Sequence, residues 1–528
     1  MATVLMIHCN RLVSGVQYPG ISSMSAFAKK AGHKFIFFDT ADYTSDKAAA
    51  SYRSYKDKPR IDLEFRAIKN KEVMPRKKSI MSLLGDLRGA IVNRKIDVIG
   101  FSSFSDDWPF ALFLIRKVRA MVPDIPIIVG GVHATVRPEQ VIKHDEVSMV
   151  CVGEGELALV DLLDAIDSGK TDTSIKNLWI KKDGKVIKNP LRPLMQFSDD
   201  VPMLDWSMYN DANFYYPFEG KLYRRGSVFI GRGCPYVCNF CINDLFGRIY
   251  GGESRRPRFK SLSYLTDELL FLKERYDLEF LRFWDETFLS MPKDYLSKFA
   301  SIYKKSIALP FTIETTAQTI NRDNARMLAE MGCRSVSVGV ETSNERLRKK
   351  VLNKPISNEA YERCFEIITE YGLRKVANFM FFLPHETLED MWQDVRLSGK
   401  WGIDHASARI FYPYAGTELR EYCMKEGMID LNALNRIEDE GSVRDMDYLN
   451  ENYITFEDTV LKVDPKTKEE GKRLMDNFIL FQETEPAMRD EVKRLLTAAD
   501  SEAARGLRDL EYRVYKKRFN EEPALETA

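Results

Sequence analysis

Short apolar runs alternate with longer segments of helical periodicity over residues 1–170. The runs have the length of strands, and the segments between them repeat apolar residues at the spacing of a helix face. Strands are expected at 4–7, 34–38, 97–102, 125–129 and 147–152. This alternation predicts an α/β domain with a parallel, doubly wound sheet, whose ligands bind at the carboxyl ends of the strands.

A second alternating region follows a polar, proline-containing connector at 171–226, in which 181–188 has the pattern of a hairpin. Its six expected strands are 228–231, 280–284, 311–315, 335–340, 375–382 and 406–411. A segment of helix length separates each strand from the next. Six β/α units over 227–425 predict a partial (β/α)6 barrel with its site at the carboxyl ends of the strands.

The last region, 426–528, is charged and helix-forming, and no strand pattern is evident in it. Helices are expected at 466–497 and 501–519. The mixed charges of 464–472 are most simply the solvated face of a helix. The alternative is that this helical C-terminal region caps the mouth of the barrel and shapes the choice of substrate.

Composition excludes several classes of protein. The 78 basic and 78 acidic residues cancel, so no excess of cations exists to displace the counterions of a nucleic acid. No apolar run approaches the ~20 residues of a transmembrane helix, and the N-terminus has no signal-peptide pattern. The 8 cysteines in 528 residues are too few for a disulfide scaffold, so we expect reduced thiols and a cytoplasmic protein. Because the charges cancel, we expect no nucleic-acid partner.

Three of these cysteines form a cluster directly after the first expected barrel strand. Cys234, Cys238 and Cys241 lie in the segment Gly-Arg-Gly-Cys-Pro-Tyr-Val-Cys-Asn-Phe-Cys. A structural zinc site usually takes four protein ligands, and no fourth Cys or His stands close by in the sequence. Three thiolates on one loop suit a four-iron cluster with one open iron. A three-cysteine zinc site and a chance group of core thiols are the alternatives.

The spacing Cys-x3-Cys-x2-Cys, with the aromatic Phe240 before the third cysteine, resembles the motif of the radical S-adenosylmethionine (SAM) superfamily. The resemblance implies a [4Fe-4S] cluster whose open iron is chelated by the amino and carboxylate groups of SAM. Electron transfer from the reduced cluster cleaves the sulfonium and releases a 5′-deoxyadenosyl radical, while the protein holds the cofactor and excludes side reactions.

Further motifs of the second region resemble the same superfamily. Asp285 and Glu286 follow the second strand, where a carboxylate is suited to pair with the ammonium of SAM. Gly339 and Glu341 resemble the fourth-strand motif, in which the glycine lets the ribose approach and the glutamate makes a polar contact. An acidic turn in solvent and a glycine packing point are the plain alternatives. The segment 382–387 resembles a fifth-strand signature but carries Phe382 and His385 where glycines are usual.

Three loops of the first domain have the residues of a binding site. A dinucleotide site is not expected, because no Gly-x-Gly-x-x-Gly follows the first strand. Glycines in the loops after the third, fourth and fifth strands would let a flat ligand lie against the strand ends, although tight strand-to-helix turns need glycines too. The candidate residues are Ser102, Ser103, Gly130, Gly131, His133, Gly153, Glu154 and Gly155.

Together these loops closely resemble the cobalamin-binding, Rossmann-like domain that is fused to one large class of radical SAM proteins. The resemblance covers about 1–420. No Asp-x-His-x-x-Gly occurs in the chain, which implies cobalamin without a protein histidine on its lower face. We expect His133 to pack or hydrogen-bond near the corrin, with axial ligation as the alternative.

The combined resemblance implies an enzyme that methylates an unactivated carbon, or a phosphinate phosphorus, of a small-molecule or biosynthetic substrate. One SAM methylates the reduced cobalamin, and a second yields the radical that activates the substrate for the methyl of methylcobalamin. Radical cyclisation, oxidation or rearrangement without methyl transfer is the alternative, and a non-catalytic cofactor-binding protein is a third. The electron requirement implies a flavodoxin- or ferredoxin-type reductant. No catalytic residue is assigned, and the five other cysteines are expected to be structural, without a second cluster.

Overall fold

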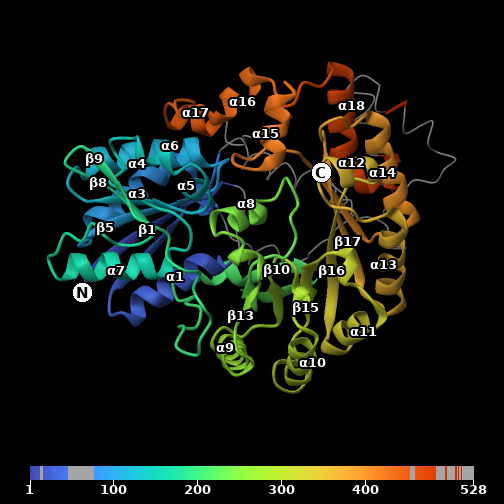
Figure 1. The fold of residues 1–528 in the computed structure, drawn as a ribbon, viewed down its shortest axis with the longest axis horizontal. Coiled ribbons are helices and arrows are strands. Elements are labelled where there is room, and N and C mark those ends of the chain that lie inside the picture. Colours follow the sequence, from blue (N-terminus) through green and yellow to red (C-terminus); the bar gives the residue numbers. More distant parts are fainter. Residues whose placement is uncertain are drawn as a thin grey trace, which may run out of the picture.

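The computed structural model describes residues 1–11, 16–45, 77–219, 221–451 and 458–482, together with a few residues between 494 and 513. Figure 1 shows an N-terminal α/β domain, in blue to teal, beside a second, larger α/β sheet in green to gold. Helices of the C-terminal region, in orange and red, lie against both.

The N-terminal domain is a seven-stranded sheet in the order β2-β1-β5-β6-β7-β8-β9. The first five strands of this order are parallel, and the last two form an antiparallel hairpin at the edge. The predicted strands and hairpin are thereby confirmed. Their bounds are β1 (Thr3–Cys9), β2 (Lys34–Asp39), β5 (Val98–Ser103), β6 (Ile127–Gly130), β7 (Met149–Cys151), β8 (Leu178–Lys182) and β9 (Lys185–Lys188).

Helices cover both faces of this sheet because the strands are apolar on both sides. In β1, Leu5 and Ile7 join the core beneath α3 (Leu83–Val92) and α4 (Trp108–Met121). Val4 and Met6 point the other way, toward α1 (Pro19–Lys30) and α7 (Glu156–Asp167). The side chains of a strand alternate between faces, so one short strand supplies two hydrophobic cores. Two short helices, α5 (Val132–Val136) and α6 (Pro138–Ile142), follow β6.

The second sheet has the order β10-β11-β14-β15-β16-β17-β18, and its last six strands are parallel. This is the predicted partial barrel of six β/α units. The strands are β10 (Tyr215–Phe218), β11 (Lys221–Val228), β14 (Phe280–Phe283), β15 (Phe311–Thr315), β16 (Cys333–Glu341), β17 (Arg374–Phe381) and β18 (His405–Ile410). Helices line its outer face: α9 (Leu262–Arg275), α10 (Lys293–Ile302), α11 (Arg322–Met331), α13 (Asn358–Glu370) and α14 (Leu388–Lys400).

The first barrel strand was expected at 228–231, and this expectation is wrong. The strand β11 ends at Val228 and begins at Lys221, inside the segment predicted as connector. Its polar start hides it from pattern analysis, because β11 pairs there with the antiparallel edge strand β10. The guanidinium of Arg225 lies 3.4 Å from the centroid of the Tyr216 ring, so even a basic residue of this strand is packed.

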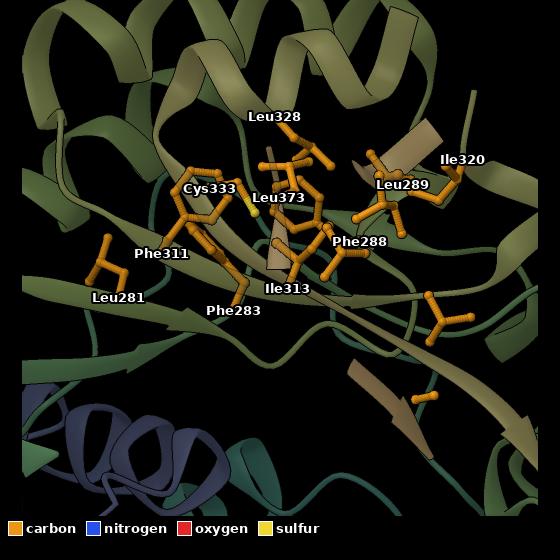
Figure 2. Close-up of a cluster of buried hydrophobic side chains, with 14 of the residues drawn as sticks. Leu281, Phe283, Phe288, Leu289, Phe311, Ile313, Ile320, Leu328, Cys333 and Leu373 are labelled. Carbon is orange, nitrogen blue, oxygen red and sulfur yellow. The ribbon is translucent and has the colours of Figure 1, made fainter. Parts of the chain in front are cut away.

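Aromatic side chains fill the core between the barrel strands and their helices, as Figure 2 shows. Phe283 of β14 and Phe311 of β15 meet edge to face, with 5.4 Å between ring centroids, and Phe288 lies 5.2 Å from Phe283. All three are fully buried. Burying a phenylalanine side chain contributes about 2 kcal/mol or more, so this cluster gives the half-barrel a rigid base for the loops above it.

The C-terminal region is helical in the residues that are described. The helix α15 (Glu418–Lys425) ends the barrel, and the C-terminal region comprises α16 (Leu431–Glu438), α17 (Met446–Glu451), α18 (Pro465–Asp476) and α19 (Phe478–Gln482). The single helix expected at 466–497 is broken at Asn477, beyond which Phe478 turns onto Phe379 of β17. The rest of that expectation, and nearly all of 501–519, lie outside the described residues. No helix in the described ranges is long and apolar enough to cross a membrane.

Candidate functional site

The three clustered cysteines lie on a loop at the carboxyl end of the first barrel strand. The loop leaves β12 (Gly231–Arg232), which pairs with β13 (Arg258–Phe259). Two glycines are required there, because a Cβ on Gly231 would lie 2.5 Å from the carbonyl oxygen of Arg258, and one on Gly233 2.6 Å from that of Ser254. Gly233 also has a φ of 109°, which disfavours any other residue.

Hydrogen bonds hold this loop against neighbouring loops of the barrel. The backbone N–H of Asn239 donates to the carbonyl of Leu352 at 3.1 Å, and its side-chain amide donates to that of Val351 at 3.2 Å. Phe240 is partly buried against the hydrophobic cluster that contains Leu347 and Leu419. The loop is therefore fixed in place by the fold, and a cofactor contact of Phe240 stays a prediction.

The thiols of Cys234, Cys238 and Cys241 are free and partly buried. Burial raises the pKa of Cys238 to about 12 and that of Cys241 to about 11, so metal binding must displace their protons. Cluster irons prefer thiolates, and three of them on one loop leave one iron of a four-iron cluster open, whereas a structural zinc site takes four protein ligands. The donor set therefore fits a [4Fe-4S] cluster.

Asp285 and Glu286 follow β14, as predicted, but they face different surroundings. Asp285 is buried, and its carboxylate accepts hydrogen bonds from the backbone N–H groups of Ile230 at 3.0 Å and Gly231 at 2.8 Å. It thus fixes the start of the cluster loop. Glu286 is exposed to solvent, yet desolvation by the surrounding protein raises its pKa. Of the two, Glu286 is the candidate partner for a cofactor ammonium.

Gly339 and Glu341 lie at the carboxyl end of β16, where the predicted fourth-strand motif places them. Glu341 has a φ of 70°, and its carboxylate lies 2.9 Å from the ammonium of Lys354. Lys354 also donates to the carbonyl of Gly339 at 2.6 Å. Although burial opposes it, Glu341 raises the pKa of Lys354, so this cation stays charged beside the cysteine loop.

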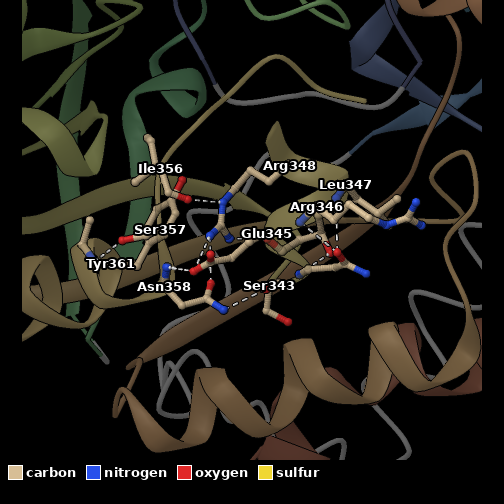
Figure 3. A network of polar contacts seen from close by, with 12 residues as sticks. Ser343, Glu345, Arg346, Leu347, Arg348, Ile356, Ser357, Asn358 and Tyr361 are labelled. Carbon is tan, nitrogen blue, oxygen red and sulfur yellow. Dashed lines mark hydrogen bonds and ion pairs between the residues drawn. The ribbon is translucent and has the colours of Figure 1, made fainter. Parts of the chain in front are cut away.

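A polar network holds the segment that follows Glu341 (Figure 3). Its centre is the fully buried Arg348, which donates to the carbonyls of Thr342 at 2.5 Å and Ile356 at 2.7 Å, and to the side chain of Asn358 at 2.8 Å. The amide of Asn358 in turn donates to the carbonyl of Ser343 at 2.9 Å. The network restrains the backbone at the end of β16 and thereby holds Glu341 and Lys354 in place.

The two departures from the fifth-strand signature keep the backbone of the glycines they replace. Phe382 has a φ of 62° and His385 a φ of 66°, a left-handed conformation that costs a non-glycine residue on the order of 1 kcal/mol. The ring of Phe382 packs where a Cβ on Gly471 of α18 would come within 2.9 Å. His385 lies 2.7 Å from the hydroxyl of Tyr422. Helix α18 thus packs against the side chain of Phe382, and helix α15 against that of His385.

In the N-terminal domain, the loops after β5 and β6 lie against each other. Gly131 has a φ of 91°, and its Cβ would come within 2.9 Å of the carbonyl oxygen of Ser103 and 3.1 Å of the hydroxyl of Ser102. Ser103 is buried and donates to the carbonyl of Phe104 at 2.8 Å. The predicted loop residues Ser102, Ser103, Gly130 and Gly131 therefore meet at the carboxyl edge, and their cofactor contacts stay a prediction.

The loop after β7 contacts the barrel. A Cβ on Gly153 would lie 1.9 Å from the hydroxyl of Tyr250, at the end of α8 (Ile242–Ile249). The carboxylate of Glu154 lies 2.7 Å from Arg258 and 3.3 Å from Arg232, and Glu156 lies 2.6 Å from Arg232. The structure thus accounts for Glu154 as a link between domains, beside Gly155.

Two histidines at the carboxyl edge have buried ring nitrogens without a hydrogen-bond partner among the described residues. His133 Nδ1 lies 3.2 Å from the hydroxyl of Ser105, but its Nε2 is unpartnered. His8 of β1 has no partner at either nitrogen. Burial lowers the pKa of His133 to about 3 and that of His8 to about 4, so both rings are neutral. Unmet polar atoms of this kind cost about 1–3 kcal/mol and fit an edge that receives a polar ligand.

Sequence analysis did not find His8, Arg232 or Tyr250. The missed signal for Arg232 was its position between two glycines of the cysteine loop. His8 lies in an otherwise apolar strand, which marks it as unusual, but only the structure reveals that its nitrogens lack partners. No local pattern marks Tyr250, because its role depends on a contact with Gly153 in the other domain.

Comparison with known proteins matches both parts of this architecture. Residues 228–398 match the model of the radical SAM superfamily, and residues 80–163 match that of the B12 binding domain. The chain is 27% identical over 335 residues to an uncharacterized methyltransferase of Pyrococcus horikoshii, covering 63% of this chain and 70% of the relative. It is 25% identical over 344 residues to the anaerobic magnesium-protoporphyrin IX monomethyl ester cyclase of Rubrivivax gelatinosus, covering 63% and 59%.

Among solved structures, the fold resembles the radical SAM methyltransferase TsrM from Kitasatospora setae, solved with cobalamin and a [4Fe-4S] cluster bound. The TM-score is 0.59 at 15% identity, over 81% of this chain and 75% of the other. The two domains and their loops therefore define a B12-binding domain joined to a radical SAM half-barrel. The chain therefore carries a B12-binding domain over 80–163 and a radical SAM domain over 228–398, and the cofactors that these two domains imply are cobalamin, a [4Fe-4S] cluster and SAM.

Proposed function

We propose that this protein is a cobalamin-dependent radical SAM methyltransferase that methylates an unactivated carbon, or a phosphinate phosphorus, of a small-molecule substrate. The observation that carries the proposal is the joining of two cofactor-binding edges in one chain. Arg232, next to the cysteine loop, is held by Glu154 and Glu156 at the carboxyl edge of the B12-binding domain. When bound, the reduced cluster and SAM supply a 5′-deoxyadenosyl radical, and cobalamin supplies the methyl group.

The residues of this chain bind and orient those groups. Cys234, Cys238 and Cys241 give up their protons to hold three irons, and the fourth iron stays open for SAM. Glu286, exposed at the carboxyl end of β14, would pair with the ammonium of SAM. Lys354 adds a fixed positive charge beside the loop, which favours a more reduced and therefore more negative cluster.

The loop residues of the N-terminal domain hold the corrin in this proposal. His133 and His8 are neutral and buried, so each can accept or donate one hydrogen bond to a corrin amide without the cost of burying a charge. Ser102, Ser103, Gly130 and Gly131 give a flat edge with little side-chain bulk. Axial ligation by His133 would instead put nitrogen directly on cobalt.

Radical cyclisation without methyl transfer is the second candidate, since three of the relatives are named as cyclases. The methyltransferase relative and the methyltransferase structure favour the first.

We further propose a flavodoxin- or ferredoxin-type reductant, because the cluster must receive an electron. We infer a cytoplasmic location, since none of the eight cysteines is paired in a disulfide, as is usual in a reducing compartment.

Anaerobic turnover of the reconstituted full chain with methyl-deuterated SAM, hydroxocobalamin and a strong reductant tests the proposal. We expect both 5′-deoxyadenosine and S-adenosylhomocysteine by mass spectrometry, and a deuterated methyl group on cobalamin. A Cys238→Ala variant should form no deoxyadenosine, whereas Cys364→Ala, which alters a buried thiol of α13, should match the wild type. Deoxyadenosine without S-adenosylhomocysteine favours the cyclase class. The absence of both products would contradict an enzymatic role.

A further inference from the structure

The end of α16 and the short segment that follows it join the half-barrel to the B12-binding domain through two glutamates, Glu438 and Glu440. The carboxylate of Glu438 accepts hydrogen bonds from Arg420 at 2.6 and 3.0 Å and from the hydroxyl of Tyr412 at 2.8 Å. Both partners belong to the end of the barrel. On the other side, Arg137 of the B12-binding domain lies 3.6 Å from Glu438. The segment is therefore fastened to the barrel two residues before Glu440.

Glu440 reaches into the B12-binding domain and is surrounded by donors. It accepts from Trp108 Nε1 at 3.0 Å, from the amide of Gln140 at 2.9 Å and from His144 Nε2 at 2.9 Å, and Lys143 lies 2.9 Å away. Although burial alone would raise it, these donors lower the pKa of Glu440, so the carboxylate is charged at neutral pH. Hydrogen bonds to a charged acceptor are about twice as strong as neutral ones.

The contact continues from Trp108 to His133. The two rings stack with 4.7 Å between centroids and 21° between planes, and His133 Nδ1 lies 3.2 Å from the hydroxyl of Ser105. The stack and the hydroxyl together fix the imidazole in one orientation. If Nδ1 donates to Ser105, the buried Nε2 carries a lone pair, and among the described residues this atom has no partner.

We propose that Glu440 is a positioning residue of the cobalamin site, acting through Trp108 on His133, whose Nε2 accepts a hydrogen bond from a corrin amide. The C-terminal region then has a defined task, which is to hold the imidazole that meets the cofactor. Figure 1 shows the orange helices α16 and α17 over α4 and α6 of the B12-binding domain. The inference rests on the proposed function, because it requires that the chain bind cobalamin.

A double-mutant cycle on hydroxocobalamin binding tests this chain of contacts. The full-length protein with a reconstituted cluster is titrated with hydroxocobalamin by equilibrium ultrafiltration. Glu440→Gln keeps the shape but removes the charge, and we expect the Kd to rise about fivefold, as for the loss of one hydrogen bond of ordinary strength. His133→Phe should raise the Kd by at least as much. Trp108→Phe tests the same contact from the other side, because phenylalanine keeps a ring but removes the N–H donor to Glu440.

The combination separates positioning from a general structural role. In the His133→Phe background, Glu440→Gln should change the Kd less than twofold, because the imidazole it positions is gone. Asp439→Asn is the matched control, since Asp439 is exposed and caps its own turn through the N–H of Gly441 at 2.9 Å, and its Kd should equal that of the wild type.

Each other outcome overturns the inference. An unchanged Kd for Glu440→Gln, or an equal rise with and without His133, refutes the positioning role while leaving the proposed function intact. Nitrogen hyperfine coupling from ¹⁵N-histidine to cob(II)alamin would show that the histidine binds cobalt directly. It would therefore refute the proposed hydrogen bond to a corrin amide. A wild type that binds no hydroxocobalamin refutes the proposed function together with this inference.

Discussion

Replacing Glu154 by glutamine tests how firmly the two domains are joined. The carboxylate lies 2.7 Å from Arg258 and 3.3 Å from Arg232, and it accepts the backbone N–H of Met195 at 2.9 Å. The glutamine keeps an acceptor oxygen but loses the charge. Two buried guanidinium groups then face an uncharged amide, and Arg232 is left with Glu156 as its charged partner.

The size of the effect follows from burial. Removing one partner of a buried ion pair costs about 3–5 kcal/mol. The side chains of Glu154 and Arg232 are each 20% exposed, and Glu156 still pairs with Arg232, so we expect a loss of about 2 kcal/mol. That value corresponds to an opening of the interface about 30-fold more frequent.

Hydrogen–deuterium exchange measures this opening directly. Peptides that contain 153–156 and 250–258 should exchange about 30-fold faster in Glu154→Gln, as a loss of about 2 kcal/mol requires, whereas the aromatic core of the half-barrel should not change. Glu139→Gln is the matched control, because Glu139 forms an exposed surface pair with Lys188 at 3.2 Å, which is worth little. Equal exchange in the two variants would refute the reasoning.

The same carboxylate predicts a pH dependence. Although burial alone would raise it, Arg232 and Arg258 lower the pKa of Glu154. A lowered pKa means that the stabilisation is present above the ordinary carboxyl range and is lost as the pH falls through the lowered value. Interface protection in the wild type should therefore decrease at acid pH, and Glu154→Gln should lack this component. A variant that loses protection in parallel with the wild type would contradict the assignment.

Three further predictions concern the barrel and its joints. Burial raises the pKa of Asp285 to about 7, so its contribution to stability should fall as the pH rises from about 4 to 7, and chemical denaturation of Asp285→Asn should lack this decline. Gly153→Ala should lower the thermal midpoint, because its Cβ would lie 1.9 Å from the Tyr250 hydroxyl; adding Tyr250→Phe should restore part of the loss, and no recovery would contradict the clash. Arg348→Lys should cost about 3 kcal/mol in urea, since lysine cannot reproduce the three directed hydrogen bonds of the buried guanidinium, and a loss below 1 kcal/mol would refute this account.

Much of the fold could be predicted because its signals are local. The strands of both sheets appear as short apolar runs, and the cysteine spacing stands on one loop. The first barrel strand could not be placed, because β11 starts with Lys221 and pairs with an edge strand. A polar strand of that kind is recognised only from its partner.

The side-chain contacts that connect the two domains could not be predicted, because they join segments that are far apart in the sequence. Trp108 and Glu440 are separated by 332 positions, and Arg232 and Glu156 by 76. The ion pairs of Glu154 with Arg232 and Arg258 also lie between distant segments, whereas its cofactor contact, expected from the glycine-rich loop, stays a prediction. Phe382 and His385 could be predicted in part. The family pattern marks them as glycine positions, and the structure gives them the positive φ of a glycine.

The central claim is that one chain holds an iron–sulfur cluster and cobalamin together. The most direct measurement is the iron and corrinoid content of the full-length protein after anaerobic reconstitution, with electron paramagnetic resonance of the reduced sample. We predict about four irons and a single cobalamin per chain, a [4Fe-4S] signal altered by SAM, and loss of the cluster but not of cobalamin in Cys238→Ala. Zinc in place of iron, about eight irons per chain, or a full cluster without bound corrinoid would contradict the account.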